Sequence, residues 1–502
     1  MSEYSNRFCG SQGAAATSRT VSIRTLIALI IGSTVGAGIF SIPQNIGSVA
    51  GPGAMLIGWL IAGVGMLSIA FVFHVLARRK PHLDSGVYAY ARVGLGDYVG
   101  FSSAWGYWLG SVIAQVGYAT LFFSTLGHYV PLFSQDHPFV SALAVSALTW
   151  LVFGVVSRGI SQAAFLTTVT TVAKILPLLC FIILVAFLGF SWEKFTVDLW
   201  ARDGGVGSIF DQVRGIMVYT VWVFIGIEGA SVYSRQARSR SDVSRATVIG
   251  FVAVLLLLVS ISSLSFGVLT QQELAALPDN SMASVLEAVV GPWGAALISL
   301  GLCLSVLGAY VSWQMLCAEP LALMAMDGLI PSKIGAINSR GAAWMAQLIS
   351  TIVIQIFIII FFLNETTYVS MVQLATNLYL VPYLFSAFYL VMLATRGKGI
   401  THPHAGTRFD DSGPEISRRE NRKHLIVGLV ATVYSVWLFY AAEPQFVLFG
   451  AMAMLPGLIP YVWTRLYRGE RVFNRFEIGV VVVLVVAASA GVIGLVNGSL
   501  SL

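Results

Sequence analysis

Long apolar runs separated by short polar segments fill most of the 502-residue chain. An α-helix needs about 20 apolar residues to cross roughly 30 Å of hydrocarbon, and thirteen runs in this chain are close to that length. The pattern therefore predicts an all-α polytopic membrane protein with about thirteen transmembrane helices. The predicted spans are residues 21–47, 53–77, 98–125, 138–157, 163–190, 213–233, 246–269, 290–318, 342–363, 371–394, 424–442, 446–464 and 477–498.

The composition agrees with this class of protein. Hydrophobic residues make up 57% of the chain and charged residues 10%, so it is more apolar and less charged than a typical soluble domain. The opening twenty residues are polar and contain no apolar segment before a cleavage site, so we expect no removable signal peptide. The 4 cysteines indicate neither a disulfide framework nor a metal site, and we expect no cofactor.

The positions of the positive charges predict how the chain is oriented. Loops rich in lysine and arginine stay on the cytoplasmic side of a membrane. If the N-terminus is cytoplasmic, the inner loops hold all 29 lysines and arginines except Lys174, Lys194, Arg202 and Arg214. We expect a protein of the cell (cytoplasmic) membrane whose C-terminus lies outside after thirteen crossings. Its net charge of +6 is then a sign of topology and lipid contact, not of a nucleic-acid partner.

The spacing of the spans predicts four parts. Residues 1–20 form a cytoplasmic tail, 21–394 a ten-helix core, 395–423 a cytoplasmic linker and 424–502 three additional helices. Ten spans can be two groups of five, here 21–190 and 213–394, and an odd number makes the second group inverted relative to the first. Inverted repeats are a common design of secondary transporters. Spans one and six would then correspond.

Both of these spans are interrupted near their middle. Span one contains "IGSTVGAGIFSIPQ", and span six contains "YTVWVFIGIEGASVY", in which Glu228 lies between Gly226 and Gly229. Matching interruptions in two repeats indicate a substrate site at the bilayer midplane. A competing interpretation is that Gly32 and Gly36 form a small-residue motif for close packing of two helices.

An interrupted helix in hydrocarbon exposes main-chain groups that a ligand can satisfy. Free N–H groups bind an anion and free carbonyl groups bind a cation. An α-amino acid carries both charges side by side, so it fits such a site. The expected N–H groups are near Gly36, Ala37 and Gly38, and the expected carbonyl groups are near Thr34, Trp222 and Ile225.

Two charged residues lie inside predicted spans. Charges there cost at least about 2.5 kcal/mol and are functional candidates by default. Lys174 can replace a bound sodium ion, or can release a proton because desolvation favours its neutral form. Either use predicts that sodium is not the coupling ion, and a purely structural lysine held by carbonyls is the alternative. Glu228 either pairs with a cation and links spans one and six, or is a satisfied helix-end group near Arg235.

Most of the 12 tryptophans are expected in the interfacial belts, but Trp222 and Trp313 are candidates of another kind because each falls inside a span. Trp222 lies beside the interruption of span six, and Trp313 lies in span eight. An aromatic face attracts an ammonium or guanidinium group by about 0.5–2 kcal/mol. These residues therefore favour a cationic substrate, although either could simply pack in the core.

Four stretches resemble one known family. They are "GSTVGAGIF", "SGVYAYARVGLGDYVGFSSAWGYW", "TVWVFIGIEGASV" and "WQMLCAEPLALMAMDGLIP". The chain is similar over nearly its whole length to the basic amino acid and polyamine antiporters of the amino acid, polyamine and organocation superfamily. Within that group it most resembles bacterial arginine/ornithine antiporters and lysine permeases.

The resemblance implies a LeuT-type fold with two inverted five-helix repeats, discontinuous helices 1 and 6, and alternating access. It implies that Gly36 to Gly38 bind the substrate carboxylate, and that Trp222 and Trp313 cover the substrate side chain. It also implies a gating role for Tyr107 in span three. Ser111 and Gln115 of the same span complete the candidate substrate-binding residues.

The resemblance assigns coupling or gating to Glu228 and Lys174, the latter standing where sodium sits in sodium-coupled relatives. Two positions depart from the family pattern. A serine of some relatives is Ala37 here, which keeps the main-chain donor and removes a hydroxyl. An asparagine used near the distal cationic group is Gln115 here, so arginine, lysine and ornithine cannot be ranked.

The leading hypothesis is sodium-independent exchange of cationic amino acids, with arginine against ornithine as the best pair. A lysine permease that works by exchange, by proton coupling or with the membrane potential is the second hypothesis. An ion channel or membrane receptor is an alternative of another class, but the polar residues gather at the midplane of a few spans instead of forming a continuous pore. An enzyme is not expected. The oligomeric state stays open, with a homodimer among the options.

Overall fold

The computed structural model describes residues 23–80, 83, 87–133, 137–157, 174–226, 240–338, 342–396 and 416–500. The predicted all-α membrane class is confirmed, because ten segments of this described part are helices long and apolar enough to cross a membrane. They are Pro52–Arg79 (α4), Asp97–Gly127 (α6), Pro138–Val156 (α7), Arg245–Phe266 in α12 (Arg240–Phe266), Pro292–Met326 (α15), Trp344–Leu363 (α16), Tyr368–Thr395 in α17 (Tyr368–Arg396), Arg418–Ala441 (α18), Pro444–Tyr467 and Arg475–Val496 (α21).

The first predicted span is divided, as its sequence indicates. Helix α2 covers Ile23–Thr34, a 3₁₀ turn η1 covers Ala37–Ser41, and α3 covers Ile42–Gly47. The sixth predicted span begins with α10 (Ile209–Trp222) and leaves the regular helix there. Residues 227–239, including Glu228, lie outside the described residues. Of the fifth predicted span, only Lys174–Gly189 is described.

Several predicted boundaries are wrong. Helix α15 continues past the predicted end at residue 318 to Met326, although Pro320 lies inside it. The predicted span 446–464 is divided into α19 (Pro444–Met454), a turn η6 (Leu455–Gly457) and α20 (Leu458–Tyr467). The C-terminal end of the predicted linker 395–423 is helical, because α18 starts at Arg418, after the N-cap Ser417.

Short helices between the spans were not predicted. They are α5 (Val87–Leu95), α9 (Trp192–Val197), α13 (Gln271–Ala275) and α14 (Ser281–Val290). Local capping explains the start of α13, because the Thr270 hydroxyl accepts from the Glu273 N–H while the Glu273 carboxylate accepts from the Thr270 N–H. Such reciprocal bonds satisfy N–H groups that a helix start leaves free.

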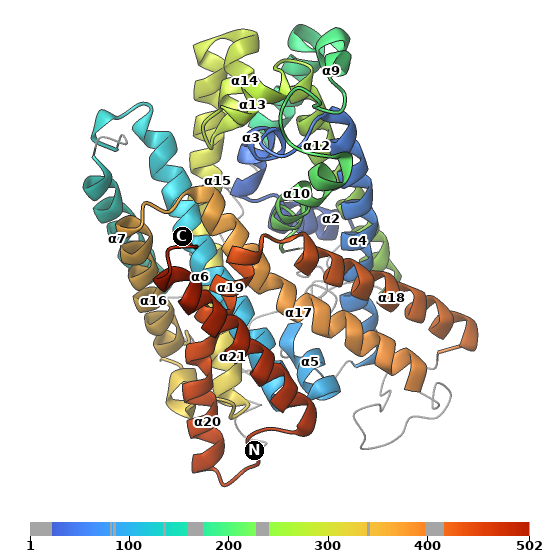
Figure 1. Cartoon of the computed structure of the whole chain (residues 1–502), viewed down its shortest axis with the longest axis vertical. Helices are drawn as coiled ribbons and strands as arrows, with labels where there is room; N and C mark the ends of the chain where they lie inside the picture. Colours follow the sequence, from blue (N-terminus) through green and yellow to red (C-terminus); the bar gives the residue numbers. More distant parts are fainter. Residues whose placement is uncertain are drawn as a thin grey trace.

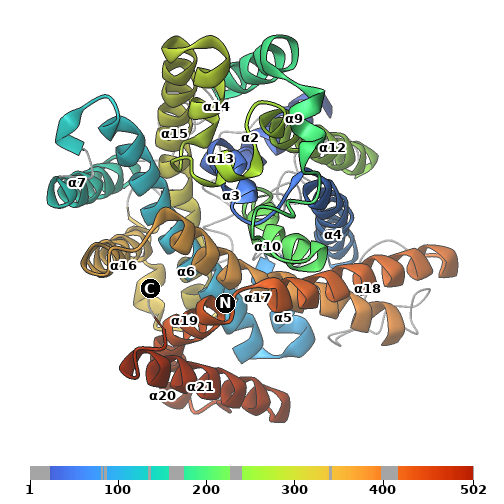
Figure 2. The same ribbon diagram turned by 45° about the horizontal axis from the view of Figure 1, so that its top comes forward.

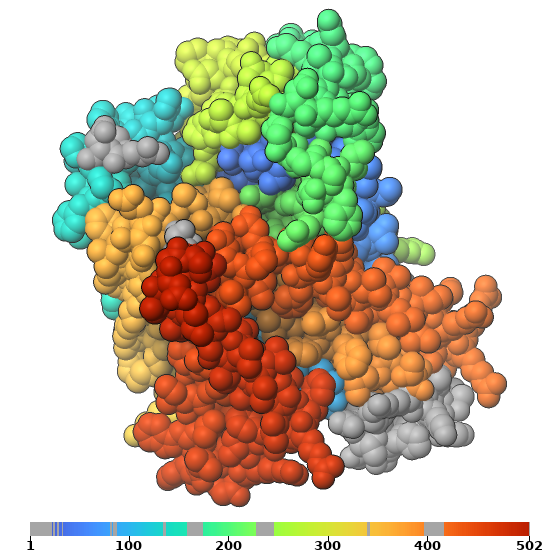
Figure 3. Space-filling view, in the orientation of Figure 1, coloured from blue at the N-terminus to red at the C-terminus, as the bar shows by residue number. Residues whose placement is uncertain are grey.

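Helix α6 is a central element of the packing. Helix α6 packs against both α17 and α15, and α12 packs against α2. At one end of the molecule lie α9, α13 and α14, and at the other end lie α5 and α20 (Figure 1). A view turned by 45° shows α7 and α16 on one side of α6 and α18 on the other (Figure 2). The C-terminal helices, drawn in red, cover one face of the lower half (Figure 3).

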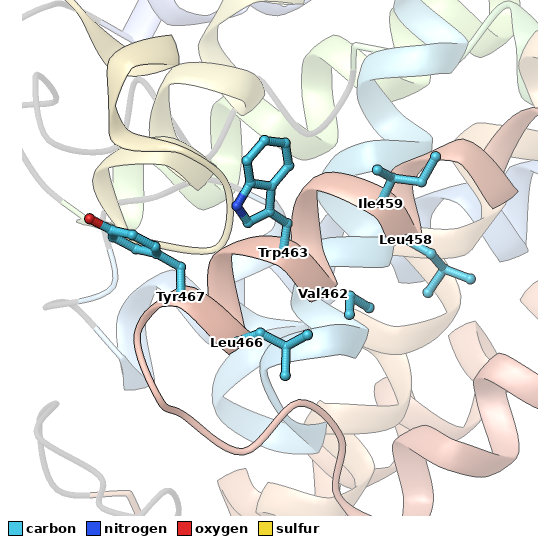
Figure 4. Close-up of a pocket in the computed structure, with 6 residues that line it drawn as sticks. All are labelled: Leu458, Ile459, Val462, Trp463, Leu466 and Tyr467. Carbon is cyan, nitrogen blue, oxygen red and sulfur yellow. The ribbon is translucent and has the colours of Figure 1, made fainter.

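A hollow of about 640 Å³ lies along α20 at the periphery. All six lining side chains come from that helix (Figure 4), and Trp463 and Tyr467 are 67% and 86% exposed. Apolar side chains of this kind are expected where a transmembrane helix faces lipid, with tryptophan and tyrosine near the interface. This hollow lacks the polar groups that a zwitterionic substrate needs.

Candidate functional site

The interruption of the first crossing lies at Val35 and Gly36. The last regular bond runs from the Val35 N–H to the Ile31 carbonyl at 2.9 Å, and the Thr34 hydroxyl donates back to the Ile30 carbonyl at 2.8 Å. Gly36 is extended (φ −96°, ψ −162°), and no side chain caps the start of η1. The first N–H groups of η1 are therefore available to an anion, as at any uncapped helix start.

Aromatic side chains crowd this interruption. A Cβ atom added to Gly38 would lie 2.4 Å from Nε1 of Trp222, so the indole of α10 rests directly on the η1 backbone. A Cβ atom on Gly36 would lie 3.2 Å from the hydroxyl of Tyr118, on α6. The rings of Tyr118 and Trp222 are 5.7 Å apart. Only glycine at position 38 permits the approach of Trp222, which fixes the spacing between the two broken segments.

The end of α10 loosens in a similar way. The Ile225 N–H is shared between the carbonyls of Val221 at 3.1 Å and Trp222 at 3.4 Å, which is the geometry of a tightening last turn. Gly226 follows with φ +106°, a conformation that side chains rarely adopt. The second interruption therefore starts where the sequence predicts it, next to Trp222 and Ile225.

One face of α6 carries the candidate residues of the third span. Tyr107, Ser111 and Gln115 are spaced by four residues, so they line a single stripe, and Tyr118 continues it. Tyr379 of α17 joins this stripe to α15. Its hydroxyl lies 2.8 Å from Ser111 Oγ, and its ring packs edge-on against Tyr107 at 5.0 Å.

Trp313 of α15 packs edge-on against the same Tyr379 ring at 6.2 Å. Both aromatic side chains are buried. Tyr379 thus connects Tyr107, Ser111 and Trp313, three residues that the sequence analysis selected separately. Four side chains from α6, α15 and α17 form one cluster as a result.

Gln115 has one buried acceptor to spare. Its Nε2 donates to the Tyr310 carbonyl at 3.2 Å and to Gln314 Oε1 at 2.9 Å, and Gln314 Nε2 donates on to Thr351 at 2.9 Å. These directed bonds use the amide nitrogen, which leaves Gln115 Oε1 buried without a partner in the described part of the chain. Thr376 Oγ1, three residues before Tyr379, is in the same condition. Orphaned acceptors of this kind suit an ammonium ligand.

Lys174 binds the end of α2. Its Nζ donates to the Gly32 carbonyl at 2.8 Å and to the Val35 carbonyl. These carbonyls belong to the last turn of the helix, where free C=O groups and the helix dipole create negative potential. The lysine therefore places a positive charge at the interruption of the first crossing, from the fifth span.

The α3 half of the first crossing is covered by the short helices α13 and α14. Gln271 Nε2 donates to the Gly47 carbonyl at 2.5 Å, and Ser281 Oγ accepts from the Gln44 N–H at 3.1 Å. A Cβ atom on Gly47 would lie 2.6 Å from Cβ of Leu274, so α13 rests directly on the end of α3. In this structure α13 and α14 pack against α3, and α14 also contacts η1.

Two residues beside the candidate site, Tyr118 and Tyr379, were missed, as was an acid elsewhere in α15, Glu319. Tyr118 could have been found, because it follows Gln115 by three residues on the same helix face. Tyr379 could not, because span ten shows no interruption or charge in sequence. Glu319 was left outside the predicted span, but it lies within α15, exposed and without an ion pair to the described residues. A carboxylate inside a transmembrane helix normally faces water or a partner rather than lipid.

Comparisons with known proteins show the family of this chain. A profile of the amino acid permease family matches residues 21–495. The L-lysine transport protein of Corynebacterium glutamicum is 99% identical over 98% of each chain. The arginine/ornithine antiporter of Pseudomonas aeruginosa is 44% identical over 97% of this chain and 99% of its own, and the arginine/agmatine antiporter of Chlamydia pneumoniae is 36% identical over 89% and 91%. The chain, with its interrupted first crossing and polytopic helical fold, belongs to the amino acid permease family.

Proposed function

We propose that this chain is a secondary transporter that carries L-lysine across the cytoplasmic membrane in exchange for another cationic amino acid. The observation that carries the proposal is the 99% identity to an L-lysine transport protein over nearly the whole length of both chains. Exchange is favoured by the relatives at 44% and 36% identity, which are both antiporters. The sequence analysis gave arginine/ornithine exchange as the leading hypothesis and lysine transport as the second. The 99% identical relative makes lysine transport the leading proposal.

The substrate backbone would bind at the two interruptions. The uncapped N–H groups at Ala37 and Gly38 would hold the carboxylate, and the carbonyls of Thr34, Trp222 and Ile225 would hold the α-ammonium. A ligand with both charges on one carbon would use both sets of groups at once. Ala37 contributes only its main chain in this arrangement, so the missing serine hydroxyl costs no donor to the carboxylate.

The substrate side chain would extend along α6. Its terminal ammonium would approach Gln115 Oε1, which is buried without a partner among the described residues. Tyr118 would lie on the near side of Gln115, and Ser111 and Tyr107 farther along the same stripe. Trp222 and Trp313 would cover the aliphatic stem and stabilise the charge by cation–π attraction. Because Tyr379 holds both Tyr107 and Trp313, movement of α17 would open or close this compartment.

Lys174 would make transport independent of sodium. Its ammonium already bonds to the carbonyls of Gly32 and Val35, so a cation is present at the end of α2 without any bound ion. Glu228, outside the described residues, would act with it in coupling or gating. A lysine that only ties α2 to the fifth span remains the alternative.

The wider arrangement follows from the same proposal. Residues 21–394 would form the inverted-repeat core, with repeats 21–190 and 213–394, and residues 424–502 the three additional helices. The N-terminus would be cytoplasmic and the C-terminus external. The activity would be transport rather than enzymatic conversion of the amino acid.

Arginine/ornithine exchange is the second candidate, favoured by the 44% identical relative of that name. The sequence departs near the expected position of the distal cationic group, where Gln115 carries one amide oxygen. A single acceptor of this kind suits an ammonium, whereas a guanidinium with its five N–H donors asks for more acceptors. If the distal group binds at Gln115, lysine and ornithine would be favoured over arginine.

Counterflow in proteoliposomes tests the proposal. Liposomes with the purified protein are loaded with lysine, ornithine, arginine, alanine or buffer, and the entry of labelled lysine is measured at zero membrane potential. Exchange of cationic amino acids predicts strong entry with internal lysine or ornithine and little with buffer. Equal entry into buffer-loaded liposomes would show uniport, and labelled arginine entering faster than lysine would favour the second candidate.

A further inference from the structure

A groove opens between the C-terminal end of α4 and the N-terminal end of α18, where both helices carry basic residues. Its volume is about 650 Å³. The helices belong to different parts of the chain, α4 to the predicted core and α18 to the additional helices, and they pack side by side. The walls combine apolar and basic side chains, namely Phe71, Val75 and Val427 with Arg78, Arg419 and Lys423.

The frame of this groove is fixed by buried hydrogen bonds. Arg79 is fully buried and donates to Asn421 Oδ1 at 2.9 Å. Asn421 Nδ2 donates in turn to the Ala394 carbonyl near the end of α17, also at 2.9 Å. The end of α4, the start of α18 and the end of α17 are therefore held together, and the groove keeps its shape whether or not it is filled.

Positive charge is in excess inside the groove. Arg78 is paired with Glu420 at 2.5 Å, which uses the acid that lines the groove. Arg419 and Lys423 lie four residues apart on one face of α18 and are exposed. Among the described residues, neither of them forms an ion pair. The groove thus presents unneutralised positive charge next to an apolar wall.

We propose that this groove binds the headgroup of an anionic phospholipid. Both walls belong to helices that cross the membrane, so the groove opens at the level where the headgroups of the bilayer lie. Basic pockets between transmembrane helices are suited to anionic headgroups. The phosphate lies between Arg419 and Lys423, and the start of an acyl chain runs along Phe71, Val75 and Val427. The bound lipid fastens the additional helix α18 to the core helix α4.

Native mass spectrometry of the full-length protein tests this site. The protein is loaded with phosphatidylglycerol or phosphatidylcholine, and lipid retention is measured as collision energy rises. We expect the wild type to retain one phosphatidylglycerol where phosphatidylcholine is lost. The double substitution Arg419→Gln and Lys423→Gln lowers that retention about tenfold or more, because each basic group contributes to the attraction.

A matched control removes two exposed inner charges elsewhere, Lys333→Gln with Arg471→Gln, and keeps wild-type retention. The substitution Glu420→Gln frees Arg78 and raises retention, an effect opposite to that of a damaged fold. Equal retention of both lipids, or unchanged retention in the groove variant, would overturn the proposal. If glycerol 1-phosphate were retained as strongly as phosphatidylglycerol, the proposal would also be overturned, in favour of a soluble phosphate ligand.

Discussion

Lys174 shows how a single side chain can decide what an interrupted helix does. Free carbonyls at the end of α2 need a positive partner, and in this chain the partner is covalently attached through the fifth span. A mobile ion at the same place would have to arrive and leave in every transport cycle. A lysine stays, so under the proposed function the driving force would come from the substrates themselves or from a proton.

Replacing Lys174 with alanine should lower lysine transport about tenfold or more, because two buried carbonyls lose their donor at a cost of about 1–3 kcal/mol each. Initial uptake into proteoliposomes measures the effect. Lys194→Ala is the matched control, since Lys194 also binds a carbonyl, that of Val268 at 2.8 Å, but in an outer loop. Wild-type uptake should be unchanged when choline replaces sodium, and uptake that requires a sodium gradient would refute the role given to Lys174.

Gly38 is a second residue with a definite expectation. Gly38→Ala places a Cβ atom 2.4 Å from the Trp222 indole, so the two broken segments must separate, at about 1–3 kcal/mol for overpacking. We expect the apparent affinity for lysine to fall about tenfold. Gly154→Ala, on α7 with open space around it, should leave affinity unchanged. Binding of labelled lysine to purified variants tests both, and normal affinity of the Gly38 variant would separate Trp222 from the site.

At the scale of elements, α21 is attached to the core by an acid in an unusual position. Glu477 is 3% exposed and accepts from the Tyr98 N–H at 2.7 Å and the Asn474 N–H at 2.6 Å. It thus caps its own helix and the start of α6 together. Gly96, with φ +124°, leaves room for this carboxylate, because a Cβ atom there would lie 2.4 Å from Glu477 Oε1.

Glu477→Ala should destabilise the protein by about 1–3 kcal/mol, because buried N–H groups of α6 and α21 lose their acceptor. A lower melting midpoint of the purified protein would show this effect. Glu470→Ala is the control, since the Glu470 side chain is 43% exposed and Arg465 keeps its ion pair with Asp97 when Glu470 is removed. Equal melting midpoints for the Glu477 variant and the wild type would mean that α21 is held mainly by apolar contacts.

The elements also show what sequence can and cannot predict here. Apolar runs and their interruptions predicted most spans and the break at Gly36, because hydropathy and glycine position are local properties. The continuation of α15 beyond Pro320 was missed. A proline removes a main-chain hydrogen bond, and in a transmembrane helix neighbouring helices can satisfy the freed carbonyl group. Tyr379, the link between Tyr107 and Trp313, depends on how α17 crosses α6, which no single segment encodes. The Glu477 contact has the same cause.

At the scale of the whole molecule, the candidate site lies at the first interruption, where η1 contacts α15 and α14. Trp222 of α10 and Tyr118 of α6 lie against Gly38 and Gly36 there, and α13 packs against α3. The C-terminal helices pack on the periphery of the core: α18 contacts α4 and α17, α19 contacts α17 and α6, and α21 contacts α6. Opening toward either side therefore requires movement of the interrupted helices against a frame that is tied at several points.

A structure of the full-length protein with bound L-lysine, determined by electron cryomicroscopy in a lipid nanodisc, is the most direct test of the central claim. The account predicts the substrate carboxylate about 3 Å from the N–H groups of Ala37 or Gly38, and its terminal ammonium beside Gln115. Density for lysine at another place, or a first crossing that forms one unbroken helix with no ligand at Gly36, would contradict it.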